Sequence, residues 1–269
     1  MFPIYAAEGW FVSHLIYRID RRVLGGVSPE ELSKSHQEFL RLVEGFCRAE
    51  NCQLFCYTLW GTKADLAILL IDPEFSRIVQ TETEILTAFP AGVLERVDSY
   101  SSMSEVSEYM SQEQDYDRTL RNKERLTPDS AEYKSKMGAF RDRMRGYINE
   151  RLYPQIPEHK TVCVYPMSKR RGDSENWYLL DFEARKKYMA SHAITGRRFQ
   201  GQVKQLVTGA IGLDDWEWVV SLFADDPYYF KKILYEMRYD EASARFGEFG
   251  HFYVGIQLEP KDLFERLKI

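Results

Sequence analysis

The chain has 269 residues, of which 44% are hydrophobic, 14% aromatic and 29% charged. A chain of this size and composition buries a substantial core, which excludes general disorder. Its 36 basic and 41 acidic residues leave a formal net charge of -5, so no overall attraction to nucleic acid or to anionic lipid is expected. Any anionic ligand therefore needs a local cluster of basic side chains.

The cysteines and the N-terminus indicate the compartment. Cys47, Cys52, Cys56 and Cys163 form no CxxC pair, and no histidine stands close to the first three. Neither a zinc site nor a disulfide framework is therefore expected, and a reduced, cytoplasmic compartment fits best. The N-terminus lacks the basic region of a secretion signal, and no apolar run approaches the roughly 18 residues of a membrane span.

Hydrophobic periodicity predicts an ordered series of elements in the first half of the chain. Strands are expected at about 11–19, 53–59, 65–71 and 92–100, with helices at about 29–49 and 73–88. The following segment, 101–128, is polar and poor in aliphatic residues. This composition is typical of a passive, exposed linker, although such a segment could also cover a pocket. Ser130 then stands where it could cap a helix that runs to about residue 150.

The second half repeats the order of the first. Strands are expected at about 161–167, 202–208, 215–223 and 252–257, with helices at about 181–195 and 227–246. Corresponding elements begin 149 to 160 residues apart, so a β-α-β-β-α-β unit occurs twice. We predict an α+β fold of tandem ferredoxin-like repeats that form antiparallel sheets, of the dimeric α+β barrel type. The expected units are 1–100 and 161–269, joined by a loop and helix at 101–160.

Residue types with functional potential gather in the second half. Tyr165, Met167 and Lys169 alternate along one strand and so share a face. Core packing is the ordinary explanation for the first two, whereas a lysine on the same face suits a ligand with carboxylate or phosphate oxygens. His192 follows Phe182 and Met189 on one helix face, near the helix C-terminus. Such a histidine is typical of a structural residue, and also of the proximal ligand in haem proteins.

The remaining polar residues of the second half are ambiguous by themselves. Gln205 alternates with Val203 and Val207, and a buried amide without partners costs about 1–3 kcal/mol. Trp216 and Trp218 share one side of the next strand, where core packing explains both. The chain contains no P-loop, GxGxxG, GxSxG or HExxH motif, which weakens nucleotide chemistry and serine or zinc hydrolysis as functions.

Several segments together resemble the chlorite dismutase family, and within it the peroxide-dependent coproheme decarboxylases. They are the His192 helix and the stretches RLYPQIP, VYPMSKRRG, NWY, TGAIGLDDWEWVVSLFADD and YEMRYDEASARFGEFGHFYVG. The resemblance covers about residues 151–257, whereas the first half matches mainly in the order of its elements.

The resemblance implies a role for each of eight residues. His192 matches the proximal iron ligand, Tyr165 the tyrosine that forms a radical, and Lys169 the lysine that contacts the reacting carboxylates. Gln205 stands at the distal position where chlorite-degrading relatives carry an arginine, which argues against chlorite dismutation. The other matches are positions that bind the porphyrin or its propionates: Arg151, Met167, Arg238 and Ser243.

The implied activity belongs to haem biosynthesis. Hydrogen peroxide would drive oxidative decarboxylation of propionates 2 and 4 of Fe-coproporphyrin III (coproheme) through a tyrosyl radical at Tyr165, giving haem b. Coproheme would be both substrate and redox cofactor. The family also implies a homopentamer, with coproporphyrin ferrochelatase as a candidate donor of coproheme. The alternatives are a haem-binding or haem-handling protein with little turnover and, disfavoured by Gln205, a chlorite dismutase or peroxidase.

Overall fold

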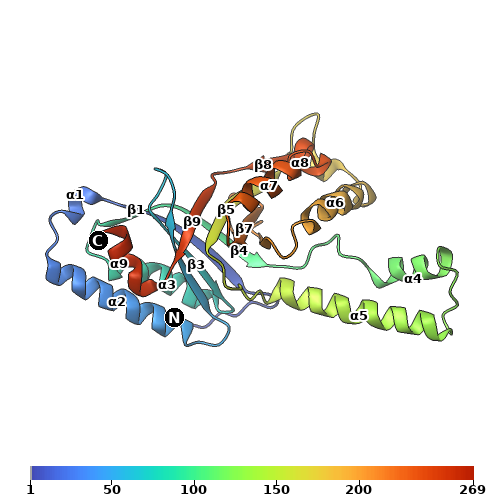
Figure 1. The fold of residues 1–269 in the computed structure, drawn as a ribbon, viewed down its shortest axis with the longest axis horizontal. Helices are drawn as coiled ribbons and strands as arrows, with labels where there is room; N and C mark the ends of the chain where they lie inside the picture. The colour runs from blue at the N-terminus through green and yellow to red at the C-terminus, as the bar shows by residue number, and fades with distance from the viewer. Residues whose placement is uncertain (1) are drawn as a thin grey trace.

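A computed structural model describes residues 2–269, which fold around one antiparallel sheet (Figure 1). The strand order is β7-β6-β4-β1-β3-β2-β9-β5-β8, and a further pairing of β7 with β5 closes eight of the strands into a barrel. The strands are β1 (Phe11–Ile19), β2 (Gln53–Leu59), β3 (Leu66–Asp72), β4 (Leu94–Ser104), β5 (Thr161–Lys169), β6 (Lys204–Gly209), β7 (Trp218–Ala224), β8 (Gly247–Phe249) and β9 (Tyr253–Leu258).

Nine α-helices accompany the sheet within the described residues. They are α1 (Arg21–Leu24), α2 (Pro29–Cys47), α3 (Phe75–Ala88), α4 (Glu113–Asn122), α5 (Ala131–Leu152), α6 (Phe182–Arg197), α7 (Tyr228–Met237), α8 (Glu241–Phe246) and α9 (Leu263–Leu267). Local chemistry sets the helix starts. Ser28 caps α2 by accepting from Glu31 N at 3.2 Å, and Pro29 occupies the first position, where no N–H is needed. None of these helices is both long and apolar enough to cross a bilayer.

Each half of the chain keeps the strand order of a ferredoxin-like unit. The first half runs β4-β1-β3-β2 and the second runs β6-β7-β5-β9. The edges of the two units pair with each other, β4 with β6 and β2 with β9, which joins the halves into one barrel. The predicted tandem ferredoxin-like repeats in antiparallel sheets are therefore confirmed. The division of the chain at residues 101 and 161 into separate units stays a prediction.

Alternation along the strands separates two packing environments in the second half. Val162 and Val164 of β5 point into the barrel, where they pack with Phe223. Cys163 and Tyr165 point to the outer face, into a cluster that includes Phe230 of α7. Helices α2, α3 and α9 cover the outer face of the first half (Figure 1). The outer face of the second half is thus the surface on which α6 and α7 lie.

Three predicted elements are wrong in their extent, and one of them, the strand expected at 92–100, continues to Ser104 as β4. The helix expected at 227–246 breaks between α7 and α8, because the side chain of Asp240 accepts from the backbone N–H of Ser243 at 3.2 Å and starts a new helix. The strand expected at 215–223 begins only at Trp218. Trp216 therefore does not share the side of Trp218, and it packs instead against the cluster inside the barrel.

The polar segment after β4 contains a helix that composition did not predict. Helix α4 packs beside α5, and the rings of Tyr116 and Phe140 stack at 4.5 Å between centroids. The resulting hairpin projects from the barrel (Figure 1). The predicted cap of α5 is confirmed, since Ser130 Oγ accepts from Tyr133 N at 3.2 Å.

Candidate functional site

A cavity of about 1290 Å³ lies on the outer face of the second half. Its lining includes residues of strands β5, β6, β7 and β8, of helices α5, α6, α7 and α8, and of the segment 103–109. All eight residues singled out from the sequence line this one cavity: Arg151, Tyr165, Met167, Lys169, His192, Gln205, Arg238 and Ser243. The fold thus brings together residues that lie up to 92 positions apart in the chain. Their individual roles stay predictions.

The register of the strands fixes how the lining residues lie on the sheet. Val207 of β6 pairs with Val220 of β7, which in turn pairs with Tyr165 of β5. Gln205 lies two residues before Val207 on β6, and Met167 lies two residues after Tyr165 on β5. The two residues are therefore on opposite sides of this row. Neighbouring strands are about 4.8 Å apart. Tyr165 and Gln205 therefore share one face but are separated by the whole width of β7.

Tyr165 is held by aromatic packing. Its side chain is buried, and its ring stacks on Phe252 with 4.4 Å between centroids and lies 6.0 Å from Phe249. Within residues 2–269 its hydroxyl makes no hydrogen bond to protein, so it is available to a ligand in the cavity. Burial raises the pKa of Tyr165 well above its ordinary value, and the phenol stays protonated at neutral pH.

Lys169 is a buried amine at the end of the same strand. Its Nζ lies 3.4 Å from the carbonyl oxygen of Ala242 and 4.6 Å from the centre of the Trp177 ring. Burial lowers the pKa of Lys169 to about 8, although the negative charges of Asp240 and Glu217 act in the opposite direction. Near neutral pH this amine can therefore both hold and release a proton.

His192 is oriented by a neighbour that sequence reasoning missed. Its Nδ1 lies 2.8 Å from Asp240 Oδ2, and the Asp240 side chain is only 1% exposed. Ser243 Oγ also donates to that carboxylate oxygen, at 3.3 Å. Burial alone would raise the pKa of Asp240, but the hydrogen bonds and charge of His192 and Ser243 outweigh it, and the pKa is lowered. With Nδ1 engaged, Nε2 is the ring nitrogen left to ligate a metal.

The cavity carries an excess of positive charge. Of its six basic lining residues, two form ion pairs: Lys204 lies 3.4 Å from Glu150, and Arg170 lies 3.7 Å from Glu248. Four have no carboxylate within 4.0 Å among residues 2–269: Arg151, Lys169, Arg197 and Arg238. The Nε of Arg151 is also buried without a hydrogen-bond partner. Such unpaired cations suit a ligand with several carboxylates, and Arg197 was not anticipated from the sequence.

The polar segment after β4 is not a passive linker. Arg185 Nε donates to the hydroxyl of Tyr109 at 3.1 Å, and Lys186 pairs with Asp115. These contacts fasten the segment to α6, and residues 103–109 line the cavity. Phe182 takes part in the same contact, since it is 41% exposed and stacks on Tyr109 with 5.9 Å between centroids. It therefore does not face the cavity with His192, as its spacing predicted.

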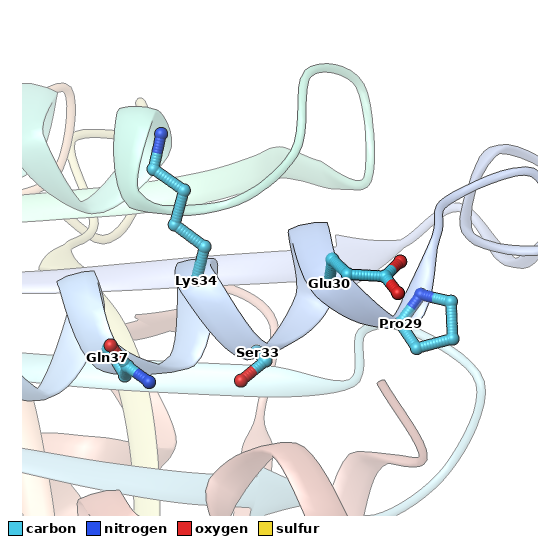
Figure 2. A pocket seen from close by; sticks show the side chains of 5 residues that line it. All are labelled: Pro29, Glu30, Ser33, Lys34 and Gln37. Carbon is cyan, nitrogen blue, oxygen red and sulfur yellow. The ribbon is translucent and has the colours of Figure 1, made fainter.

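A second, shallow hollow of about 450 Å³ lies against the start of α2. Figure 2 shows the side chains that line it, which all come from this one helix: Pro29, Glu30, Ser33, Lys34 and Gln37. Lys34 extends away from Ser33 and Gln37 in that view, so the polar groups do not converge on a common point. The cavity over the second half is therefore the candidate site.

Comparison with known proteins agrees with this fold. The family model for chlorite dismutase matches residues 32–258. A heme-binding protein from Thermus thermophilus superposes with a TM-score of 0.80 at 35% identity, covering 100% of this chain and 98% of that chain. Chlorite dismutase from Candidatus Nitrospira defluvii in complex with imidazole has the same fold, with a TM-score of 0.72 at 16% identity over 98% and 97% of the two chains.

A longer relative matches almost the whole sequence. A putative heme-binding protein of Natronomonas pharaonis is 36% identical over 264 residues, which is 97% of this chain. The chain spans only 41% of the length of that relative. From the family model and the identity to the Thermus protein, we conclude that the chain belongs to the chlorite dismutase family.

Proposed function

We propose that the cavity binds coproheme and that the chain converts it to haem b by hydrogen-peroxide-dependent decarboxylation of two propionates. The observation that carries this proposal is the meeting of His192, Tyr165 and Lys169 in one cavity that is also lined by unpaired cations. Relatives named for heme binding support the class of ligand. The expected homopentamer, cytoplasmic location and ferrochelatase partner stay predictions.

The residues present fit an iron porphyrin. His192 would hold the iron through Nε2, since its Nδ1 is held by Asp240 Oδ2 at 2.8 Å. Among residues 2–269, no three His, Cys, Asp or Glu side chains gather where they could hold a metal ion. A single histidine is nevertheless sufficient when the porphyrin itself provides the remaining nitrogen ligands.

The charges favour coproheme over haem b as the starting ligand. Coproheme carries four propionates and haem b carries two. Transfer of each carboxylate out of water is costly unless it gains a cation or a hydrogen bond. The four unpaired cations of the cavity, among them Arg151 with its orphaned Nε, can compensate a tetracarboxylate ligand. A site for a dicarboxylate porphyrin would leave some of these charges without partners.

The reaction consumes one hydrogen peroxide for each propionate. The propionate carboxylate takes up one proton and loses its β-carbon hydrogen and the bond to its carboxyl carbon, and the products are a vinyl group, carbon dioxide and two waters. When bound, the iron porphyrin supplies the redox centre at which peroxide is reduced. Tyr165 would give up its phenolic hydrogen atom to become a radical, and the hydrogen from the β-carbon would restore the phenol. The β-carbon radical would then lose its remaining electron to the bound redox centre as its bond to the carboxyl carbon breaks.

Other side chains orient the reacting group and manage protons. Lys169 lies four residues beyond Tyr165 on the same strand face, so its amine can hold a propionate near the phenol. With a pKa of about 8, the amine can also exchange a proton during turnover. Gln205 contributes a neutral amide, which can donate hydrogen bonds but brings no positive charge to the distal side. A protein that only binds haem would need neither the buried phenol nor the buried amine.

Substitution of Tyr165 separates binding from turnover. Tyr165→Phe removes a hydroxyl without protein hydrogen bonds and keeps the stacking on Phe252, so the variant should bind coproheme as well as wild type. It should form no vinyl product when peroxide is added. Tyr235→Phe, at a tyrosine 60% exposed on α7, is the matched control and should react normally. Full turnover by Tyr165→Phe would contradict the proposal, and binding without reaction by wild type would support the haem-handling alternative.

A further inference from the structure

Glu105 is the one carboxylate of the cavity lining that no cation neutralises within residues 2–269. The cavity is lined by three acidic residues, of which Glu150 lies 3.4 Å from Lys204 and Glu108 lies 3.9 Å from Arg185. Glu105 has no basic group within 4.0 Å, and its Oε1 accepts from Trp218 Nε1 at 3.2 Å. Its side chain is exposed, so the carboxylate is reachable from the cavity that it lines.

A glycine makes this position of the carboxylate possible. Gly209 of β6 pairs with Trp218 of β7, and the carboxylate of Glu105 lies directly over it. A Cβ at position 209 would overlap the carboxyl carbon of Glu105, which lies only 2.5 Å from the ideal Cβ position. The Glu105 carboxylate therefore lies against the sheet beside Gly209 and Trp218, which define what we call the Gly209–Trp218 end of the cavity. Met167 of β5 pairs with Trp218 in the same row.

We propose that Glu105 is a specificity-determining residue that decides which edge of the porphyrin enters this end of the cavity. The inference rests on the proposed function, because it assumes a ligand with four carboxylates. A propionate placed against Glu105 would meet a like charge in a space from which the ligand has displaced water, which is costly. In coproporphyrin III one edge carries two adjacent methyl groups and no propionate. The Gly209–Trp218 end therefore accepts that methyl edge, and no propionate lies against Glu105.

The type I isomer of coproporphyrin provides the discriminating probe. It has the same four propionates, but they alternate with methyl groups so that every edge carries a carboxylate. Wild type should bind the iron-free type III isomer roughly fivefold or more tightly than type I at low ionic strength, measured by quenching of tryptophan fluorescence. Glu105→Gln keeps an oxygen that can accept from Trp218 and removes only the charge. In this variant the preference should fall to within about twofold, chiefly because type I binds more tightly.

Two control variants separate charge from packing. Glu150→Gln neutralises a lining carboxylate that already has a cation partner, and Trp218→Phe removes the hydrogen bond to Glu105 but leaves its charge. Both should retain the preference for type III. An unchanged isomer ratio in Glu105→Gln, or loss of the preference in Trp218→Phe alone, would overturn the inference while leaving the proposed function intact. Failure of wild type to bind either isomer would contradict the proposed function itself.

Discussion

Replacement of Asp240 by alanine should destabilise the second half of the protein and release His192. The carboxylate caps α8 by accepting from Ser243 N at 3.2 Å, and loss of an N-cap costs about 1 kcal/mol. It also holds His192 Nδ1 at 2.8 Å, a charge-assisted hydrogen bond worth about 1.5 kcal/mol or more at a buried carboxylate. The expected loss in the free energy of unfolding is therefore about 2–3 kcal/mol.

Urea denaturation followed by circular dichroism measures this loss directly. Asp240→Asn should cost less, about 1 kcal/mol, since the amide oxygen can still cap α8 and accept from His192. The iron spectrum of the coproheme complex should change in Asp240→Ala, because the imidazole is no longer held in one orientation. If the free energy of unfolding of Asp240→Ala lay within about 0.5 kcal/mol of the wild-type value, the argument that Asp240 connects His192 to α8 would be refuted.

Three further predictions concern the cavity. The pKa of Lys169 is about 8 in the folded chain against an ordinary 10.5, so the unfolded chain binds more protons between these values. As pH rises from 8 to 10.5, the free energy of unfolding of wild type should therefore increase by up to about 3 kcal/mol relative to that of Lys169→Met. If the urea midpoints of the two proteins kept a constant difference across this range, the burial argument would be refuted. Gly209→Ala should displace the Glu105 carboxylate and reduce the preference for type III coproporphyrin, and an unchanged preference would contradict the close contact. Tyr109→Phe removes the acceptor of Arg185 and should speed limited proteolysis within residues 105–115, whereas wild-type resistance would show that this contact does not hold the segment.

The fold was largely predictable because its signals are local. Strands such as Phe11–Ile19 and Gln53–Leu59 begin and end where periodicity placed them. Helix α4 was missed because its buried residues are few, with Leu120 the one buried side chain among its ten residues. The break between α7 and α8 was missed because it depends on the side chain of Asp240 accepting from the backbone, which apolar periodicity does not report.

The candidate site was predictable only through resemblance. Taken alone, His192 and Met167 were more typical of structural residues than of a site, and the structure adds that they line one cavity. Asp240 and Arg197 were not predicted because their roles depend on which residues lie near them in space. Asp240 lies 2.8 Å from His192, and Arg197 lines the cavity without an ion pair among residues 2–269. Glu105 lay in a polar segment taken for a linker, and only the pairing of β4 with β6 brings it to the cavity.

The most direct test of the proposed function is the mass of the porphyrin after reaction. Purified protein loaded with coproheme is titrated with hydrogen peroxide, and the products are resolved by mass spectrometry after each addition. We expect two successive losses of one carbon dioxide and two hydrogens, through a three-propionate intermediate to haem b, with one peroxide consumed at each step. Bleaching of the porphyrin without any vinyl product would contradict the assignment of coproheme decarboxylation to this chain.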